Sequence, residues 1–255
     1  MDKPQGQTDD GVLLLLQIRD IDDPMREQEV ACFGTAIEGN WRLTTHSLLD
    51  GAPSEQQLRE ARAVLIGGSG DYSVVTGGPW LEEALEAMRM LVEWGTPTFA
   101  SCWGFQAMAR ALGGVVVTSE AHAELGTVEL ELTEAGRRHP LTSALPPKFM
   151  ACMGHHDMVV ELPQQAQLLA SSRKVKNQAF AIPGKPIIAT QFHPELQRSE
   201  LVQRIEAYPQ YLAAATGETV ESFQARCVET PEANQLIGRF LEALQRAESG
   251  GIFMQ

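Results

Sequence analysis

The chain has 255 residues, of which 44% are hydrophobic and 21% are charged, as is typical of a globular protein with a sizeable buried core. Its formal net charge of −13, without any cluster of Lys and Arg, argues against a nucleic-acid partner, because phosphate binding requires concentrated positive charge. The excess of acid also repels anionic membranes.

The first apolar run, Val12 to Leu16, is far too short to span a membrane and follows acidic residues rather than a basic segment. It therefore indicates a buried strand and no membrane association. Residues 1–10 and 249–255 are expected to be disordered ends. The four cysteines are far apart and form no CxxC pair, so neither a disulfide framework nor a zinc site is indicated. Reduced thiols favour a cytoplasmic location.

Short β-rich runs alternate with helical segments in the first half of the chain, which predicts parallel βαβ units. Strands are predicted at 12–18, 63–66 and 98–101. A helix is predicted after Pro79, where apolar residues repeat at helical spacing: Leu81, Ala84, Leu85, Met88 and Leu91.

The segment from Val115 to Gln191 is predicted to form short strands separated by glycine and proline turns, as the second half of a mixed sheet. These strands are expected at 127–132, 148–153, 167–172 and 187–191. The later segment is mostly helical, and Thr230 is expected to cap a final amphipathic helix that begins at Pro231. These helices are expected to cover the edge of the domain.

The predicted fold is therefore α/β, with a mixed, mostly parallel central sheet flanked by helices and a helical C-terminal extension. The main domain is expected over residues 11–196. Residues 197–248 are expected to form the helical extension, packed on the same domain, and no internal repeat divides the chain.

Cys102 lies where an apolar strand, 98–101, is followed directly by a helical segment. A nucleophile at such a turn projects from the bend, and the helix N-terminus favours the reactive thiolate. Taken alone, Cys102 is better explained as a small buried hydrophobic residue, as most cysteines are.

A second buried strand ends in the segment His193-Pro194-Glu195. Ligands bind at the carboxyl ends of strands in parallel α/β sheets, so this segment and Cys102 can meet at the same edge. A thiol needs a base that removes its proton, and the base needs an acid that orients it. Cys102, His193 and Glu195 supply these three groups, which makes them candidates for a catalytic triad.

The apolar strand at 63–66 ends in a glycine-rich turn that includes Gly68 and Gly70. Glycines allow backbone amides to approach a ligand closely, and such amides can form an oxyanion hole. A phosphate-binding loop is the competing interpretation, but the Lys-Ser/Thr pair of that motif is absent and no helix follows at once.

Together, the glycine-rich loop, the segment around Cys102 and the His-Pro-Glu motif resemble class I glutamine amidotransferases, from about Val12 to Leu196. The resemblance implies a flavodoxin-like fold and hydrolysis of the side-chain amide of glutamine through a γ-glutamyl thioester, without a cofactor. Two departures from the family pattern precede the nucleophile, Ala100 in place of a glycine and Ser101 in place of an apolar residue. Asp71-Tyr72 stands where relatives often carry a proline.

The resemblance also implies roles for individual residues. Cys102 would attack the amide, His193 would pass the proton to the departing ammonia, and Glu195 would orient His193. Other residues would hold the substrate or stabilise the oxyanion through backbone or side-chain groups: Gly68, Gly70, Trp103 and Gln106.

The stretch Gly154-His155-His156-Asp157 is similar to the segment that binds the α-amino and α-carboxylate groups of glutamine in the glutaminase domain of GMP synthase. These four residues are therefore candidates for substrate binding. A metal site is the alternative, since His and Asp are ligand types, but adjacent residues on a strand point to opposite faces. We therefore expect no metal.

Three functions remain open after the sequence is considered. The first is a glutamine amidotransferase that passes ammonia to a separate synthetase, because the segment after Leu196 has no phosphate-binding motif and is too short for a nucleotide-activating domain. The second is a hydrolase of γ-glutamyl amides or peptides that uses the same triad. The third is a non-catalytic binding protein that retains the fold.

Overall fold

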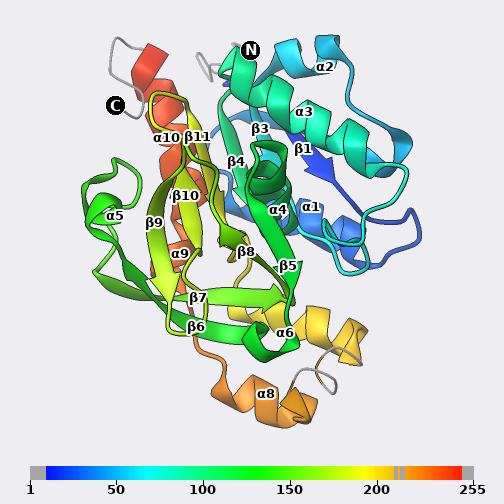
Figure 1. Cartoon of the computed structure of the whole chain (residues 1–255), viewed down its shortest axis with the longest axis vertical. Coiled ribbons are helices and arrows are strands. Elements are labelled where there is room, and N and C mark those ends of the chain that lie inside the picture. Colours follow the sequence, from blue (N-terminus) through cyan, green and yellow to red (C-terminus); the bar gives the residue numbers. More distant parts are fainter. Residues whose placement is uncertain (1–9, 210–211, 213–215, 249–255) are drawn as a thin grey trace, which may run out of the picture.

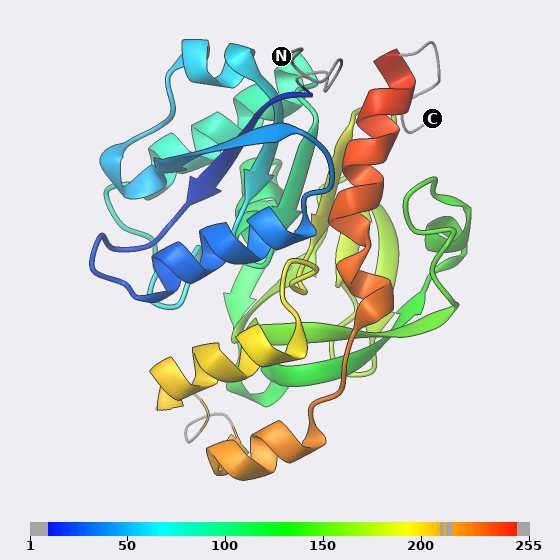
Figure 2. The same ribbon diagram turned by 180° about the vertical axis from the view of Figure 1, so that it is seen from behind.

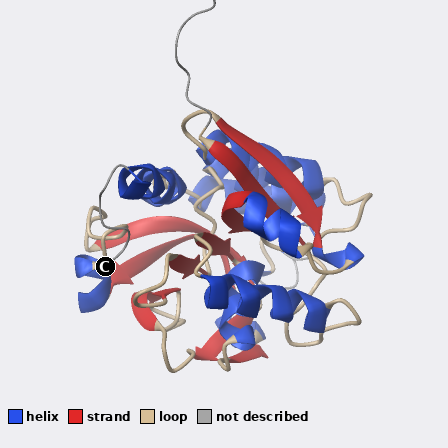
Figure 3. Cartoon of the chain, turned by 90° about the horizontal axis from the view of Figure 1, so that it is seen from above, coloured by secondary structure: helices blue, strands red, loops and turns tan. Residues whose placement is uncertain are grey.

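The structure, a computed structural model, describes residues 10–209, 212 and 216–248. These residues form a nine-stranded mixed sheet in the order β2-β1-β3-β4-β11-β10-β9-β6-β7, with helices on both faces (Figures 1 and 2). Seen from above, the strands lie between helices (Figure 3). The predicted α/β class is confirmed. The expected disordered ends lie outside the described residues, except for Asp10.

Five neighbouring strands are parallel and form the half of the sheet that carries the motifs: β2 (Trp41–Ser47), β1 (Gly11–Gln17), β3 (Ala61–Ile66), β4 (Thr98–Ser101) and β11 (Ile187–Thr190). Apart from β2, they match the predicted strands to within two residues. β2 was not predicted, because this strand at the sheet edge is only half-buried and its polar residues leave no apolar run.

The rest of the sheet is antiparallel, in agreement with the predicted mixed sheet. It contains β10 (Ala179–Ala181), β9 (Gln167–Ser172), β6 (Glu124–Leu132) and β7 (Lys148–His155). A separate antiparallel pair joins β5 (Val115–Thr118) to β8 (Asp157–Glu161), and this pair lies beside the carboxyl end of α4 in Figure 1.

Each face of the sheet is covered by its own pair of long helices. On one face, Leu14 and Leu16 of β1 pack with α3 (Leu81–Trp94) and α4 (Trp103–Ala111). On the other face, Leu13 and Leu15 pack with α1 (Met25–Ala36) and α10 (Leu236–Glu248), which lie in front in Figure 2. This alternation along β1 is the period of two expected of a strand. The shorter helices are α2 (Glu55–Glu60), α5 (Glu134–Arg138) and two 3₁₀ turns (Leu48–Asp50, Glu120–His122).

The C-terminal helices occupy two different places. α6 (Arg198–Ala207) and α8 (Val220–Arg226) lie beyond the carboxyl ends of the parallel strands, whereas α10 covers a face of the sheet and not its edge (Figures 1 and 2). Thr230 precedes α9 (Pro231–Asn234) as expected, although its side chain makes no capping hydrogen bond, and the single final helix expected from Pro231 is interrupted at Gln235 before α10 begins. No helix in the described ranges is both long and apolar enough to cross a bilayer.

Candidate active site

The three segments singled out by the sequence follow three adjacent strands. β3, β4 and β11 are parallel neighbours, and they are followed by the glycine-rich loop, by Cys102 and by the His193-Pro194-Glu195 segment. Because parallel neighbours end at the same edge of a sheet, segments distant in sequence meet there.

Cys102 occupies a strained turn between β4 and α4. Its φ of 52° and ψ of −102° make it the one non-glycine residue with positive φ in the described part of the chain. Such a conformation costs about 1–3 kcal/mol and persists only where the surroundings impose it. Here the Cys102 N–H donates to Thr190 O at 2.8 Å, which fixes the turn against β11. The thiol therefore projects at the N-terminus of α4.

His193 and Glu195 are buried beside this thiol. His193 Nδ1 lies 2.7 Å from Glu195 Oε1, and the His193 N–H donates to Cys152 O at 2.9 Å. Burial lowers the pKa of His193, but electrostatic interactions and hydrogen bonds with Cys102 and Glu195 raise it to about 9. Burial raises the pKa of Glu195, whereas the charge and hydrogen bond of His193 lower it below its usual value. Thiol, imidazole and carboxylate thus form one coupled cluster.

Gly68 packs directly against this cluster. A Cβ on Gly68 would lie 2.8 Å from His193 Cε1 and 3.7 Å from Cys102 Sγ, so a larger residue would displace the imidazole. The Gly68 N–H, which the sequence predicts as an oxyanion-hole donor, donates to Glu29 Oε1 at 3.0 Å in this structure. Gly70 lies farther along the loop, against the ring of Tyr208.

The first turn of α4 supplies two further candidates. Trp103 is the first residue of α4, where backbone N–H groups have no acceptor within the helix. Gln106 is buried, and its Nε2 donates to Asp157 O at 2.9 Å and to Gln191 Oε1 at 3.2 Å. Gln106 therefore ties α4 to β8 and to the segment that precedes His193.

The histidines of the 154–157 stretch point to different sides. The ring of His155 is buried, with Nδ1 3.0 Å from Asp157 O and Nε2 3.3 Å from Glu124 Oε2. His156 faces Glu120 on the surface, where Nδ1 and Oε2 are 3.1 Å apart. This divergence agrees with the alternation expected along a strand.

Of the other two residues of this stretch, Gly154 faces Cys102, and Asp157 faces β5 and the segment that follows the glycine-rich loop. The Gly154 carbonyl oxygen lies 3.8 Å from Cys102 Sγ. The Asp157 carboxylate accepts hydrogen bonds from the hydroxyls of Ser73 and Thr118, each at 2.5 Å. Within the described ranges, no three Asp, Glu, His or Cys side chains are grouped so that they could hold a metal ion.

A pocket of about 480 Å³ opens at this edge of the sheet. Nine of the eleven residues that the sequence singled out line it, and the other two, Gly68 and Glu195, do not. One wall comes from the C-terminal extension: Leu201, Arg204, Ile205 and Tyr208. A larger hollow of about 1170 Å³ follows β6 and β9, but no cysteine or histidine lines it, so the smaller pocket is the candidate active site.

Sequence reasoning missed two polar residues that contact the site. Gln191, whose Nε2 lies 3.9 Å from Cys102 Sγ, precedes His193 by two positions at the end of an apolar strand. Glu29 shares the buried face of α1 with Met25 and Phe33, at spacings of four residues. An acid on an apolar helical face indicates a specific buried partner, and this signal was available in the sequence.

The fold and the site define an α/β protein with a cysteine, a histidine and a glutamate at the carboxyl ends of adjacent parallel strands. The chain belongs to the class I glutamine amidotransferase family, whose family model matches residues 43–207. This match covers the loop, the nucleophile segment and the His-Pro-Glu segment.

Named relatives agree with this membership. The chain is 30% identical over 157 residues to a glutamine-hydrolysing GMP synthase subunit of Sulfurisphaera tokodaii, and the match covers 62% of this chain and 78% of that protein. It is 35% identical over 130 residues to a GMP synthase of Lactobacillus delbrueckii subsp. bulgaricus, of which it covers only 25%. The chain thus corresponds to about a quarter of the length of such GMP synthases.

Solved structures share the fold. A glutamine amidotransferase from Thermotoga maritima superposes with a TM-score of 0.70 at 22% identity, over 92% of this chain and 97% of that one. A glutamine amido transferase from Methylobacillus flagellatus gives a TM-score of 0.67 at 19% identity, over 97% and 96% of the two chains. The second match extends over nearly the whole chain, so the C-terminal helices are part of the shared architecture.

Proposed function

We propose that the protein hydrolyses the side-chain amide of glutamine, with Cys102 as nucleophile, His193 as general base and acid, and Glu195 as the residue that orients His193. The observation that carries this proposal is the buried cluster in which His193 interacts with Cys102 on one side and lies 2.7 Å from Glu195 on the other. Membership of the family and the names of the relatives support glutamine as substrate.

In the first half-reaction, Cys102 Sγ forms a bond to the amide carbon while the carbonyl oxygen takes the negative charge. His193, protonated by the thiol, gives that proton to the departing nitrogen, and the C–N bond breaks to release ammonia. Water then adds to the thioester with His193 as base, and the C–S bond breaks to give glutamate and the free thiol. The Trp103 N–H stands at the N-terminus of α4, where it can stabilise the oxyanion.

Substrate recognition is assigned to the pocket lining. Gly154, His155, His156 and Asp157 would present backbone groups to the α-amino and α-carboxylate ends of glutamine, as in the resembling segment of GMP synthase. Gln106 and the loop at Gly70 would hold the side chain. The ammonia would pass to a separate synthetase partner, a proposal supported by the Sulfurisphaera tokodaii relative, which is named as one subunit of a GMP synthase.

A second candidate, hydrolysis of γ-glutamyl amides larger than glutamine, is favoured by the walls of the pocket. Its volume of about 480 Å³ lies within the range of sites that bind drug-sized ligands. Side chains of α6 line one wall, where they could contact a substituent on the amide nitrogen. The triad chemistry would be the same for both substrates.

One experiment separates these functions. The purified protein and a Cys102→Ala variant are incubated with glutamine and with γ-glutamyl amides of increasing size, and ammonia, amine and glutamate are measured. Cysteine-dependent ammonia release from glutamine supports the first function, and faster cleavage of larger amides supports the second. If the folded wild-type protein cleaves none of these substrates, with or without a synthetase partner, a non-catalytic binding role remains.

A further inference from the structure

The peptide group between Gly67 and Gly68 is held at both ends. Its carbonyl oxygen, on Gly67, accepts a hydrogen bond at 3.1 Å from the Gly104 N–H in the first turn of α4. Its N–H, on Gly68, donates to Glu29 Oε1 at 3.0 Å. The C=O and N–H of a trans peptide point in opposite directions. The carbonyl therefore faces the N-terminus of α4, beside Cys102, and the N–H faces α1.

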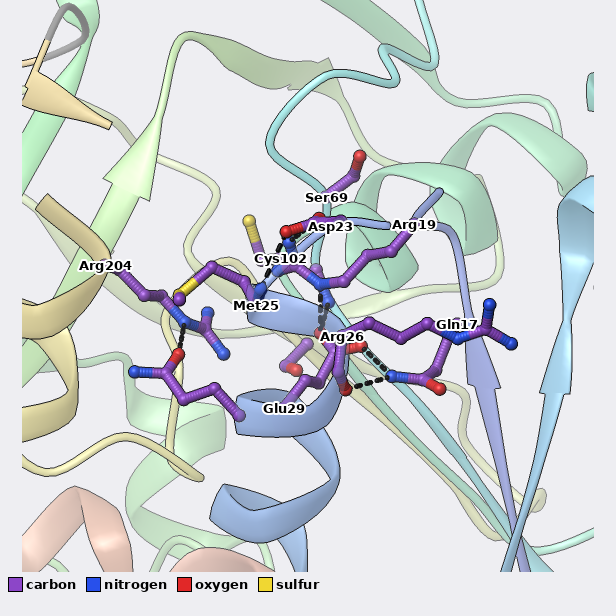
Figure 4. A network of polar contacts seen from close by, with 12 residues as sticks. Gln17, Arg19, Asp23, Met25, Arg26, Glu29, Ser69, Cys102 and Arg204 are labelled. Atoms are coloured by element: carbon purple, nitrogen blue, oxygen red, sulfur yellow. Dashed lines mark hydrogen bonds and ion pairs between the residues drawn. The ribbon is translucent and has the colours of Figure 1, made fainter. Parts of the chain in front are cut away.

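Glu29 is well fixed in this position. It is fully buried, its Oε2 accepts a hydrogen bond from Gln17 Nε2 at 2.9 Å, and Arg19 Nε lies 3.5 Å from its Oε1 (Figure 4). A Cβ on Gly67 would lie 2.5 Å from the carboxylate, so Glu29 packs closely against the loop. Glu29 does not line the pocket, and any effect on the reaction must act through Gly68.

We propose that Glu29 is a positioning residue that holds the Gly67–Gly68 peptide in a resting orientation, and that this peptide turns over before the Gly68 N–H can stabilise the oxyanion. The inference rests on the proposed function. Glycine on both sides of the peptide permits the turn, since glycine adopts positive and negative φ about equally readily. In the turned orientation the Gly67 carbonyl oxygen would face the Glu29 carboxylate, and two acceptors repel. Glu29 thus opposes the active orientation.

The chemistry of a substitution at Glu29 follows from this geometry. Glu29→Gln preserves the volume, and its amide N–H can donate to the turned Gly67 carbonyl, which favours the active orientation. Glu29→Met also preserves the volume but offers neither acceptor nor donor. Arg19 retains Asp23 as its ion-pair partner at 2.9 Å in both variants, so neither leaves a lone buried charge.

The test compares glutamine hydrolysis with alkylation of Cys102 by iodoacetamide, a reaction that forms no oxyanion. Loss of the charge-assisted hydrogen bond between Glu29 and the Gly68 N–H shifts the equilibrium between the resting and turned orientations of the peptide by about 10-fold or more. The kcat of Glu29→Gln is therefore expected to rise about 10-fold. The kcat of Glu29→Met should rise less. The alkylation rate of both variants should stay within about 2-fold of the wild-type rate, because the substitutions leave the thiol and His193 unchanged. Glu27→Gln, on the exposed side of α1, is the matched control and should change neither rate.

A folded Glu29→Gln enzyme with lower kcat and unchanged alkylation would overturn the inference, because Glu29 would then support the oxyanion hole. If Glu29→Gln does not fold, Glu29→Met decides by the same criteria. Hydrogen exchange of the Gly68 amide, followed by NMR, needs no turnover: protection is expected in the wild type and faster exchange in both variants. If the Gly68 amide of the wild type exchanges without protection, the inference is contradicted, even when the protein hydrolyses no substrate. If the wild type only fails to release ammonia, the proposed function alone is contradicted.

Discussion

His193 Nδ1 lies 2.7 Å from Glu195 Oε1, two residues later in the chain. The turn that allows this contact is fixed from outside, because Asn234 Nδ2 donates to Pro194 O at 2.9 Å and to Leu196 O at 2.6 Å. An ionised carboxylate accepts hydrogen bonds only, so Nδ1 carries a proton and Nε2 is left for the thiol. The geometry thus leaves Nε2 as the atom of His193 that exchanges a proton with the thiol.

Replacing Glu195 by Gln should lower the pKa of His193, because the carboxylate's charge and hydrogen bond contribute to its value of about 9. The ordinary pKa is 6.5, so the folded state binds more protons between about pH 6.5 and 9. Stability from His193 is therefore complete below pH 6.5 and is lost as the pH rises through 9.

Thermal unfolding at a series of pH values checks this prediction. The midpoint temperature of the wild type should fall between pH 6.5 and 9, and the fall should be shallower in Glu195→Gln. NMR titration of the His193 ring should show the lower pKa directly. Identical titration midpoints in the two proteins would show that Glu195 does not act on this ring.

Replacing Cys102 by Ala should abolish amide hydrolysis, by about 10⁴-fold or more, without unfolding the protein. The side chain is at the edge of the sheet, and its removal leaves the hydrogen bond from the Cys102 N–H to Thr190 O intact. The remaining cysteines, all buried free thiols, serve as controls: Cys32, Cys152 and Cys227. Their Ala variants should retain most of the activity. Unchanged ammonia release from the Cys102 variant would rule out this nucleophile.

Replacing Gly68 by Ala should lower kcat by about 10²-fold, the scale expected when a catalytic group moves by about 1 Å. The new Cβ would lie 2.8 Å from His193 Cε1, so the ring must shift. Gly34→Ala, in α1 with no atom within 4 Å of the new Cβ, is the matched control. It should stabilise the fold by about 0.5–1 kcal/mol and leave kcat unchanged. Steady-state kinetics and thermal unfolding of both variants test this prediction. A fully active Gly68→Ala enzyme would contradict the close packing of Gly68 against His193.

Replacing Ile205 by Phe should discriminate between the two proposed substrate classes. Ile205 is buried in α6 and lines the pocket, so a larger ring reduces the space for a substituent on the amide nitrogen. KM for γ-glutamyl amides with bulky amines should rise at least about 10-fold, whereas KM for glutamine should change little. An equal rise for both substrates would place Ile205 beside the glutamyl part of the pocket.

Much of the site could be predicted because its residues follow apolar strands. The run before Cys102 and the run before His193 were each recognisable as strands, and both begin and end within one residue of the prediction. The half-buried β2 was not predicted because it has no sustained apolar run, and β10 was not predicted because it is only three residues long. The burial of Glu29 could have been predicted from its place on the apolar face of α1, but the contacts that Glu29 and Gln191 make could not, because packing and not local sequence selects the partner of a side chain.

The sequence by itself determined the α/β class, most of the strands along the chain and the three segments that carry the candidate chemistry, because hydrophobic periodicity and glycine placement are local properties. Only the tertiary structure decided which strands are neighbours, and hence that Cys102 meets His193 across β4 and β11. The tertiary structure also decided that α6 forms a wall of the pocket and that Glu29 accepts a hydrogen bond from the Gly68 N–H. Both contacts join segments far apart in the chain, and burial and shape, not local pattern, select such contacts.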